Sequence, residues 1–178
     1  MVGPLVLVVC GVSGAGKTTI GRLLATHTGR VFLDADDFHP PGNVAKMRRG
    51  EPLTDTDRAP WLAALREHVD RAVSAQQPLV LACSALKSTH REALGIDQHH
   101  VVSVFLEGAP ALIAARIAGR QHAFMPAGLL HSQFASLEPP ADGIRVSIDQ
   151  TPAAIVQAIV SAAASHPARD AAGAPRST

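Results

Sequence analysis

The chain reads GVSGAGKT at residues 11–18, directly after an apolar run at residues 5–9 and at the start of an amphipathic pattern at residues 17–28. This stretch matches the pattern G-x-x-x-x-G-K-[ST] in the context of strand, loop and helix that the pattern requires. Glycines let such a loop turn its backbone N–H groups inward around an anion, and the helix that follows adds the positive end of its dipole. A glycine-rich turn that only starts a helix would not need Lys17. The stretch therefore predicts a phosphate-binding loop for a nucleoside triphosphate.

The polar residues of this loop have distinct expected roles. Lys17 is expected to reach the terminal phosphates as a catalytic residue, and the Thr18 hydroxyl to ligate Mg²⁺. The residues of this segment expected to bind the nucleotide are Gly11, Ser13, Gly14, Ala15, Gly16, Lys17, Thr18 and Thr19.

Short apolar runs alternate with helical patterns along most of the chain. Strands are expected at residues 5–9, 31–33, 79–82, 101–106 and 145–148, and helices at residues 17–28, 57–75 and from Pro152 onward. This alternation predicts an α/β fold of three layers, with a parallel five-stranded sheet covered by helices on both faces. We expect a single domain over residues 1–166 and a disordered tail over residues 167–178, which show no periodicity.

The composition excludes several classes of protein. The 178 residues are 47% hydrophobic and 17% charged, which excludes a disordered chain. Sixteen Lys and Arg stand against fifteen Asp and Glu, so we expect neither a nucleic-acid nor a membrane partner. The two cysteines, Cys10 and Cys83, lie in apolar runs and are expected to be buried thiols rather than a disulfide. With no signal-peptide pattern at residues 5–9, a cytoplasmic location is expected.

Two polar segments interrupt the alternation of strands and helices. Residues 38–57 are rich in Pro, Gly and charge, too polar for a core and too long for an ordinary turn. We expect this segment, called the insert below, to lie over the site and bind substrate. Residues 118–126 carry Arg120 and His122 with little that could pack, which predicts a mobile lid.

Two aspartates follow the strand expected at residues 31–33. Because strand residues alternate between faces, Asp34 and Asp36 are expected to point the same way at the carboxyl end of the sheet. Asp34 would then hold Mg²⁺ together with Thr18, and Asp36 would act as a catalytic residue that orients or deprotonates an acceptor hydroxyl. A pair of solvated turn aspartates is the alternative. The guanine signature N-K-x-D is absent from the sequence, which favours ATP over GTP.

The sequence resembles the gluconokinase family, small ATP-dependent kinases related to shikimate and adenylate kinases. Besides GVSGAGKT, the resemblance rests on LDADDFHP at 33–40, NVAKM at 43–47, GEPLTD at 50–55, DR at 57–58, PWL at 60–62, CSALK at 83–87, Arg91, FMP at 124–126, LL at 129–130, SQF at 132–134 and LE at 137–138. It covers roughly residues 5–164. It implies a P-loop kinase fold, and a homodimer that phosphorylates D-gluconate at its 6-hydroxyl with ATP and Mg²⁺, giving 6-phosphogluconate.

The lid departs from the pattern of the family. Relatives typically read Arg-x-Gly-His-Phe-Met, whereas this chain reads RQHAFM at residues 120–125, so the histidine stands one place early and the glycine is lost. The role of that histidine is therefore not transferred to His122.

Several cations in the insert and after the third strand suit the carboxylate of a sugar acid. The residues expected to bind the substrate are Asp36, His39, Lys46, Arg49, Arg58, Lys87 and Arg91, whereas Arg48, Arg66 and Arg71 are interpreted as solvated charges. Arg116 and Arg120, four residues apart, could face a transferred phosphoryl group from one side of a helix, with Arg120 as the catalytic member. Surface charge at a helix end is the alternative for this pair. The resemblance adds Gln150 and Pro152 at the adenine.

Two other functions remain open at this point. One is a kinase for another small hydroxy acid such as shikimate, because related kinases share the two aspartates after the second strand. The other is a non-catalytic ATP-binding regulatory module that uses ATP to order its insert and lid around a protein partner. A catalytic kinase needs a carboxylate for the acceptor and cations for the substrate, and the insert supplies both.

Overall fold

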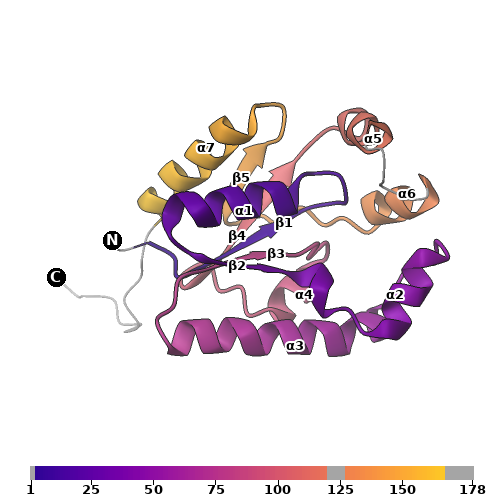
Figure 1. The fold of residues 1–178 in the computed structure, drawn as a ribbon, viewed down its shortest axis with the longest axis horizontal. Coiled ribbons are helices and arrows are strands. Elements are labelled where there is room, and N and C mark those ends of the chain that lie inside the picture. Colours follow the sequence, from indigo (N-terminus) through magenta and orange to yellow (C-terminus); the bar gives the residue numbers. More distant parts are fainter. Residues whose placement is uncertain (1–2, 120–126, 167–178) are drawn as a thin grey trace.

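Five parallel strands form the centre of the molecule, in the order β2-β3-β1-β4-β5 (Figure 1). The computed structural model describes residues 3–119 and 127–166. The strands are β1 (Val6–Cys10), β2 (Val31–Asp34), β3 (Leu79–Ala82), β4 (Val101–Glu107) and β5 (Ile144–Ser147). The helices are α1 (Lys17–Thr28), the 3-10 helix η1 (Ala35–Phe38), α2 (Pro41–Arg48), α3 (Asp55–Ser74), α4 (Ser88–Ala93), α5 (Pro110–Ala118), α6 (Ala127–Ala135) and α7 (Pro152–Ser165). The predicted fold class is confirmed.

Helices cover both faces of the sheet, and the alternation of side chains along β1 explains how. Leu7 and Val9 pack into one buried cluster with residues of α1 and α7. Val6, Val8 and Cys10 pack into another cluster with residues of α3. Figure 1 shows α1 and α7 on one side of the sheet and α3 on the opposite side. A strand buried on both faces must be apolar at every position, which accounts for the continuous run at residues 5–9.

The two cysteines are buried free thiols, as their apolar surroundings predicted. Burial raises the pKa of both Cys10 and Cys83 to about 12, so neither is a thiolate at neutral pH. They behave as small core residues.

The strand at residues 31–34 differs from the expectation of burial on both faces. β2 is an edge strand, and Val31 is 41% exposed. An edge strand has a partner on one side only, so its sequence can be apolar while its side chains remain accessible.

The insert contains a helix that its polar composition did not indicate. α2 begins at Pro41, where a proline has the φ angle of a helix and lacks an N–H that would have no partner there. α3 then begins at Asp55, two residues earlier than predicted, because Thr54 and Asp57 form a capping box. No helix within the described residues has the length and apolar character needed to cross a bilayer.

Candidate active site

The loop between β1 and α1 has the backbone shape of a phosphate-binding loop. Gly11, Gly14 and Gly16 have φ angles of +141°, +82° and +98°, which favour glycine over other residues. A Cβ on Gly14 would also lie 2.7 Å from the Ile117 side chain, so α5 packs directly on the loop. The predicted phosphate loop therefore has the required conformation, and its glycines are needed for it.

The side chain of Lys17 is partly buried over this loop. Its Nζ donates a hydrogen bond to the Val12 carbonyl oxygen at 3.0 Å. Desolvation lowers the pKa of the Lys17 ammonium group, and the negative charges of Asp36 and Asp34 oppose this effect. A desolvated cation held beside backbone N–H groups forms a site for an anion.

A small cavity of about 220 Å³ lies beside the loop. It is lined by Gly14, Ala15, Gly16, Thr19, Ile20, Arg116, Gln150, Pro152 and Ile155. The structure thus brings the predicted residues of α5 and of the β5–α7 junction next to the phosphate loop. The Arg116 guanidinium donates to the Ile148 carbonyl oxygen at 2.6 Å, which fixes this arginine at the end of the last strand.

Asp34 and Thr18 form a pair of oxygen donors at the start of α1. The Thr18 hydroxyl donates to Asp34 Oδ2 at 2.7 Å, and the Asp36 backbone N–H donates to Asp34 Oδ1 at 3.1 Å. Hydroxyl and carboxylate oxygens suit Mg²⁺, so this donor set fits the predicted ion. Within residues 3–119 and 127–166, no group of three or more His, Cys, Asp and Glu side chains could hold a metal. An ion here would take most of its ligands from phosphate and water.

Asp36 lies in the turn that follows β2, not in the strand itself. β2 ends at Asp34, and residues 35–38 form the 3-10 helix η1, so the expected alternation of strand faces does not apply to Asp36. The Asp36 side chain is 82% exposed and lies on the wall of a large cavity together with Lys17. The two carboxylates therefore have different surroundings. The Asp34 carboxylate accepts from the Thr18 hydroxyl, and Asp36 lines the cavity.

This larger space, called the insert cavity, has a volume of about 560 Å³ and runs from the phosphate loop to the insert. It is lined by Ser13, Lys17, Asp36, His39, Val44, Met47, Pro52, Leu53, Thr54, Asp55, Arg58, Ser84, Leu86, Lys87, Leu129, Ser132, Gln133 and Ser136. Four of the predicted substrate residues are among them: Asp36, His39, Arg58 and Lys87. The structure thus gathers a carboxylate, an imidazole and two cations around one space.

His39 is held against the core by Trp61. The two rings stack with their centroids 4.2 Å apart, and the Trp61 indole N–H donates to the Ala35 carbonyl oxygen at 2.8 Å. Burial lowers the pKa of His39, so its imidazole is neutral at pH 7. Its buried Nδ1 has no hydrogen-bond partner among the described residues. Trp61 is buried in the core, and it also fixes the turn that carries Asp36.

Three predicted substrate residues lie outside the walls of this cavity. Lys46 Nζ binds both carboxylate oxygens of Asp57, at 2.7 and 2.9 Å. Arg49 forms a two-bond pair with Glu51 on the exposed end of α2. Arg91 is buried and donates to the carbonyl oxygens of Ala85 and Leu86, at 3.1 and 3.2 Å. Each of these cations already has a partner within the fold, and Arg91 holds the turn after β3 in place.

The pair formed by Lys46 and Asp57 predicts a dependence of stability on pH. Lys46 first, and then Thr54, lower the pKa of Asp57 from 3.8 to about 2. A carboxyl group with a depressed folded-state pKa stabilises the fold above its unfolded pKa, and this contribution is lost as the pH falls through the folded value. We expect the difference in urea midpoint between the wild type and Asp57→Asn to narrow as the pH falls from about 4 to about 2.

Asp70→Asn is the matched control, because Asp70 lies on the same helix and forms an exposed pair with Arg66. Its difference from the wild type should stay small over the same range. A difference for Asp57→Asn that stayed constant from pH 6 to pH 2 would show that this carboxylate does not titrate as the contacts require.

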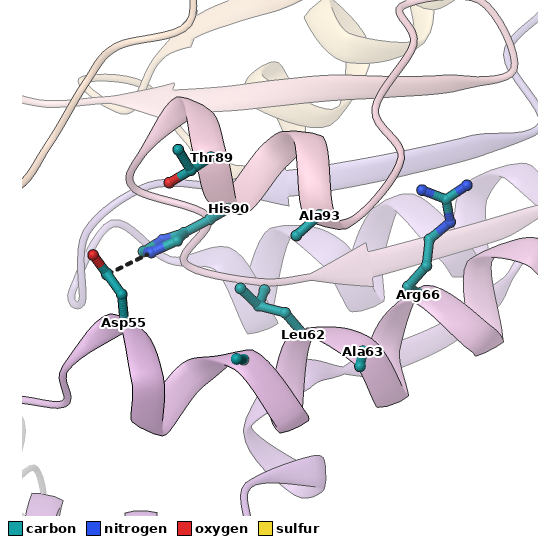
Figure 2. Close-up of a pocket in the computed structure, with 8 residues that line it drawn as sticks. Asp55, Leu62, Ala63, Arg66, Thr89, His90 and Ala93 are labelled. Atoms are coloured by element: carbon teal, nitrogen blue, oxygen red, sulfur yellow. Dashed lines mark hydrogen bonds and ion pairs between the residues drawn. The ribbon is translucent and has the colours of Figure 1, made fainter.

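Asp55 connects the insert cavity to a second space. Asp55 Oδ2 accepts from Lys87 Nζ at 2.7 Å, and Oδ1 lies 3.2 Å from His90 Nε2 and 3.8 Å from Arg58 Nη1. A cavity of about 450 Å³ lies behind it between α3 and α4, where Figure 2 shows Leu62 and Ala93 facing the same space. The two cavities share only Asp55. No phosphate-loop residue lines the second cavity, so the chemistry belongs to the insert cavity.

Several polar residues of the insert cavity were not predicted from the sequence, among them Asp55 and Gln133. Both lie within stretches that carry the family resemblance, GEPLTD and SQF, but no local pattern assigned them a role. Gln133 Oε1 accepts the backbone N–H of Ser13 in the phosphate loop at 2.7 Å. Arg120 and His122, together with the tail at residues 167–178, lie outside the described residues.

Comparison with known proteins agrees with this geometry. The family described as shikimate kinase matches residues 13–138. A gluconokinase of Gluconobacter oxydans is 45% identical over 160 residues, which cover 88% of this chain and 90% of that protein. The chain belongs to the gluconokinase family. The family resemblance is confirmed, and the chain is a kinase.

Among the solved structures, a gluconokinase is more similar to this chain than a shikimate kinase is. The crystal structure of a gluconokinase from Sinorhizobium meliloti is similar with a TM-score of 0.83 and 38% identity, covering 93% of this chain and 94% of that one. A shikimate kinase from Acinetobacter baumannii, in complex with shikimate, has a TM-score of 0.56 and 21% identity, covering 88% of this chain and 91% of that one. The second likeness shows a shared fold alone.

Proposed function

We propose that this kinase transfers the γ-phosphoryl group of ATP to the 6-hydroxyl of D-gluconate, giving 6-phospho-D-gluconate and ADP. The observation that carries the proposal is the insert cavity, which joins Lys17 of the phosphate loop to Asp36 and to the cations Arg58 and Lys87. The names of the relatives support the choice of gluconate, since the Gluconobacter oxydans protein is a gluconokinase.

Asp36 is proposed to receive the acceptor hydroxyl. Its exposed carboxylate lies on the same wall as Lys17, so a hydroxyl bound to it would face the phosphate loop. Asp36 would orient the hydroxyl and accept its proton as the oxygen attacks phosphorus. Lys17 would neutralise charge on the transferred group.

Arg58 and Lys87 are proposed to bind the carboxylate of the substrate, and neutral His39 to bind a hydroxyl. Both cations contact Asp55 across the cavity wall, at 3.8 Å for Arg58 and 2.7 Å for Lys87. This arrangement holds two positive groups in place before any substrate binds. Lys46, Arg49 and Arg91 would then contribute through the insert and the turn after β3, which their ion pairs and hydrogen bonds hold.

The nucleotide is proposed to bind with its phosphates on the loop and its base in the cavity near Arg116, Gln150 and Pro152. Thr18 and Asp34 would hold Mg²⁺, which neutralises charge on the phosphate oxygens when bound. The catalytic role of Arg120, a homodimer and a cytoplasmic location complete the proposal, and all three rest on the sequence and its resemblance.

The test is a coupled ADP-release assay with D-gluconate, D-glucose and shikimate as acceptors. Gluconate should give turnover, and glucose should be poorer in kcat/KM by roughly 10²-fold or more, because it lacks the carboxylate that the two cations would bind. Shikimate supplies a carboxylate, but its rigid ring cannot extend a primary hydroxyl toward Asp36.

Other outcomes of this assay would favour the alternatives. Equal kcat/KM for shikimate and gluconate would favour a kinase of another hydroxy acid. Equal kcat/KM for glucose would show that the cations do not recognise a carboxylate. Binding of ATP without faster ADP release on addition of any acid would favour a regulatory module.

A further inference from the structure

Gln133 joins the phosphate loop to the wall of the insert cavity. It lies on α6, 120 residues from Ser13 in the sequence, and its Oε1 accepts the Ser13 backbone N–H at 2.7 Å. The same side chain lines the cavity that also contains Lys17 and Asp36. Gln133 therefore contacts the phosphate loop and lines the same cavity as Lys17 and Asp36.

The bond to Ser13 fixes the orientation of the amide. A backbone N–H can only donate, so the atom of Gln133 that faces Ser13 must be the oxygen, and Nε2 is directed elsewhere. Nε2 makes no hydrogen bond within residues 3–119 and 127–166, and it is not among the buried polar atoms that lack a partner. Within the described part of the chain, the two N–H groups of Nε2 therefore have no protein acceptor.

The chain that follows α6 is also held in place. The Glu138 N–H donates to the Leu86 carbonyl oxygen at 2.9 Å, and Glu138 Oε2 accepts from Ser88 N at 2.7 Å and Ser88 Oγ at 2.8 Å. These bonds connect the segment after α6 to the turn between β3 and α4. The Gln133 amide itself is held by its bond to Ser13, so its donor needs little reorganisation when charge develops in front of it.

We propose that Gln133 is a further catalytic residue of the kinase reaction, donating from Nε2 to an oxygen of the phosphoryl group during transfer. The inference rests on the proposed function. In the step, the bond from the acceptor oxygen to phosphorus forms while the bond from phosphorus to the leaving oxygen of ADP breaks. The acceptor proton passes to Asp36, and Gln133 exchanges no proton; it stabilises charge on the transferred oxygens.

Two variants separate this role from a purely structural one. Gln133→Met has a similar length but neither polar group, and Gln133→Glu keeps an oxygen for the Ser13 N–H while it replaces the donor by a second oxygen. Gln157→Met is the matched control, because Gln157 is an exposed glutamine of α7 outside the cavities described above. Steady-state ADP release with gluconate, ATP affinity and thermal unfolding would be measured for all of them.

Gln133→Met is expected to lower kcat by about 10²-fold, as for the loss of one donor to a transition-state oxyanion, while ATP affinity changes by less than about 3-fold. The kcat of Gln133→Glu at pH 8 is expected to fall by at least the same factor. Its kcat relative to the wild type should rise as the pH falls toward 5, because a protonated carboxyl group regains an O–H donor. A purely structural tie between α6 and the loop would instead appear in Gln133→Met as a loss of ATP affinity or of thermal stability, without a separate loss of kcat.

Three results would contradict the role proposed for Gln133 or the function on which it rests. Near-normal kcat for Gln133→Glu at pH 8 would show that only the bond to Ser13 matters, and would overturn the inference even if Gln133→Met failed to fold. A wild-type protein that releases no ADP with gluconate would overturn the proposed function together with the inference. An active wild type with unaffected variants would overturn the inference alone.

Discussion

Replacement of Lys17 by alanine is expected to abolish phosphoryl transfer while the protein keeps its fold. The Lys17 ammonium group makes one hydrogen bond, to the Val12 carbonyl oxygen, within the part of the chain that the structure describes. Its charge would meet its partners only when phosphates are bound. Charge-assisted hydrogen bonds of this kind contribute roughly 1.5–3 kcal/mol each in the ground state, and a larger amount as charge moves in the transition state.

The expected loss of turnover for Lys17→Ala is therefore about 10³-fold or more. Thermal stability should be unchanged or slightly higher, because a partly desolvated ammonium group is removed. Arg71→Ala, which removes an exposed cation from α3, is the matched control and should retain turnover. Near-normal ADP release by Lys17→Ala would refute the assignment of residues 11–18 as the phosphate loop.

The two aspartates after β2 are expected to differ when each is replaced by asparagine. Asp36→Asn should keep the affinity for ATP and Mg²⁺ but lower turnover by roughly 10²-fold or more, because the group that orients and deprotonates the acceptor is neutralised. Asp34→Asn should instead raise the Mg²⁺ concentration required for half-maximal rate, because Asp34 is paired with the Thr18 hydroxyl at 2.7 Å. Mg²⁺ titrations of ADP release distinguish the two effects.

Equal losses of metal affinity in both variants, with no extra defect of Asp36→Asn at saturating Mg²⁺, would contradict this division of roles. Asp37→Asn is a suitable control, since Asp37 lies on the same 3-10 helix and is exposed. It should keep both the turnover and the Mg²⁺ requirement of the wild type.

The sequence was sufficient to predict the features that depend on neighbouring residues. The phosphate loop, the helix at Lys17–Thr28 and the strand at Leu79–Ala82 each follow from a local pattern of glycine or apolar residues, and the structure has them at the predicted positions. The buried thiols follow in the same way from the runs around Cys10 and Cys83. Local patterns succeed here because backbone conformation and burial are set over a few residues.

Features that depend on distant partners could not be predicted. The charge of Lys46 made it a candidate for the substrate carboxylate, but only the packing of α2 beside α3 shows that Asp57 is its partner. The position of Asp36 depends on Asp34, whose side chain accepts from the Asp36 N–H as the strand ends. Gln133 meets Ser13 across 120 residues, a contact that no spacing in the sequence indicates.

The most direct test of the account is identification of the product by ³¹P and ¹³C NMR after incubation of the purified protein with ATP, Mg²⁺ and D-gluconate. A phosphate monoester on carbon 6 of gluconate is expected, in an amount equal to the ADP formed. Release of inorganic phosphate with unchanged gluconate, or a phosphate ester at another carbon, would contradict it.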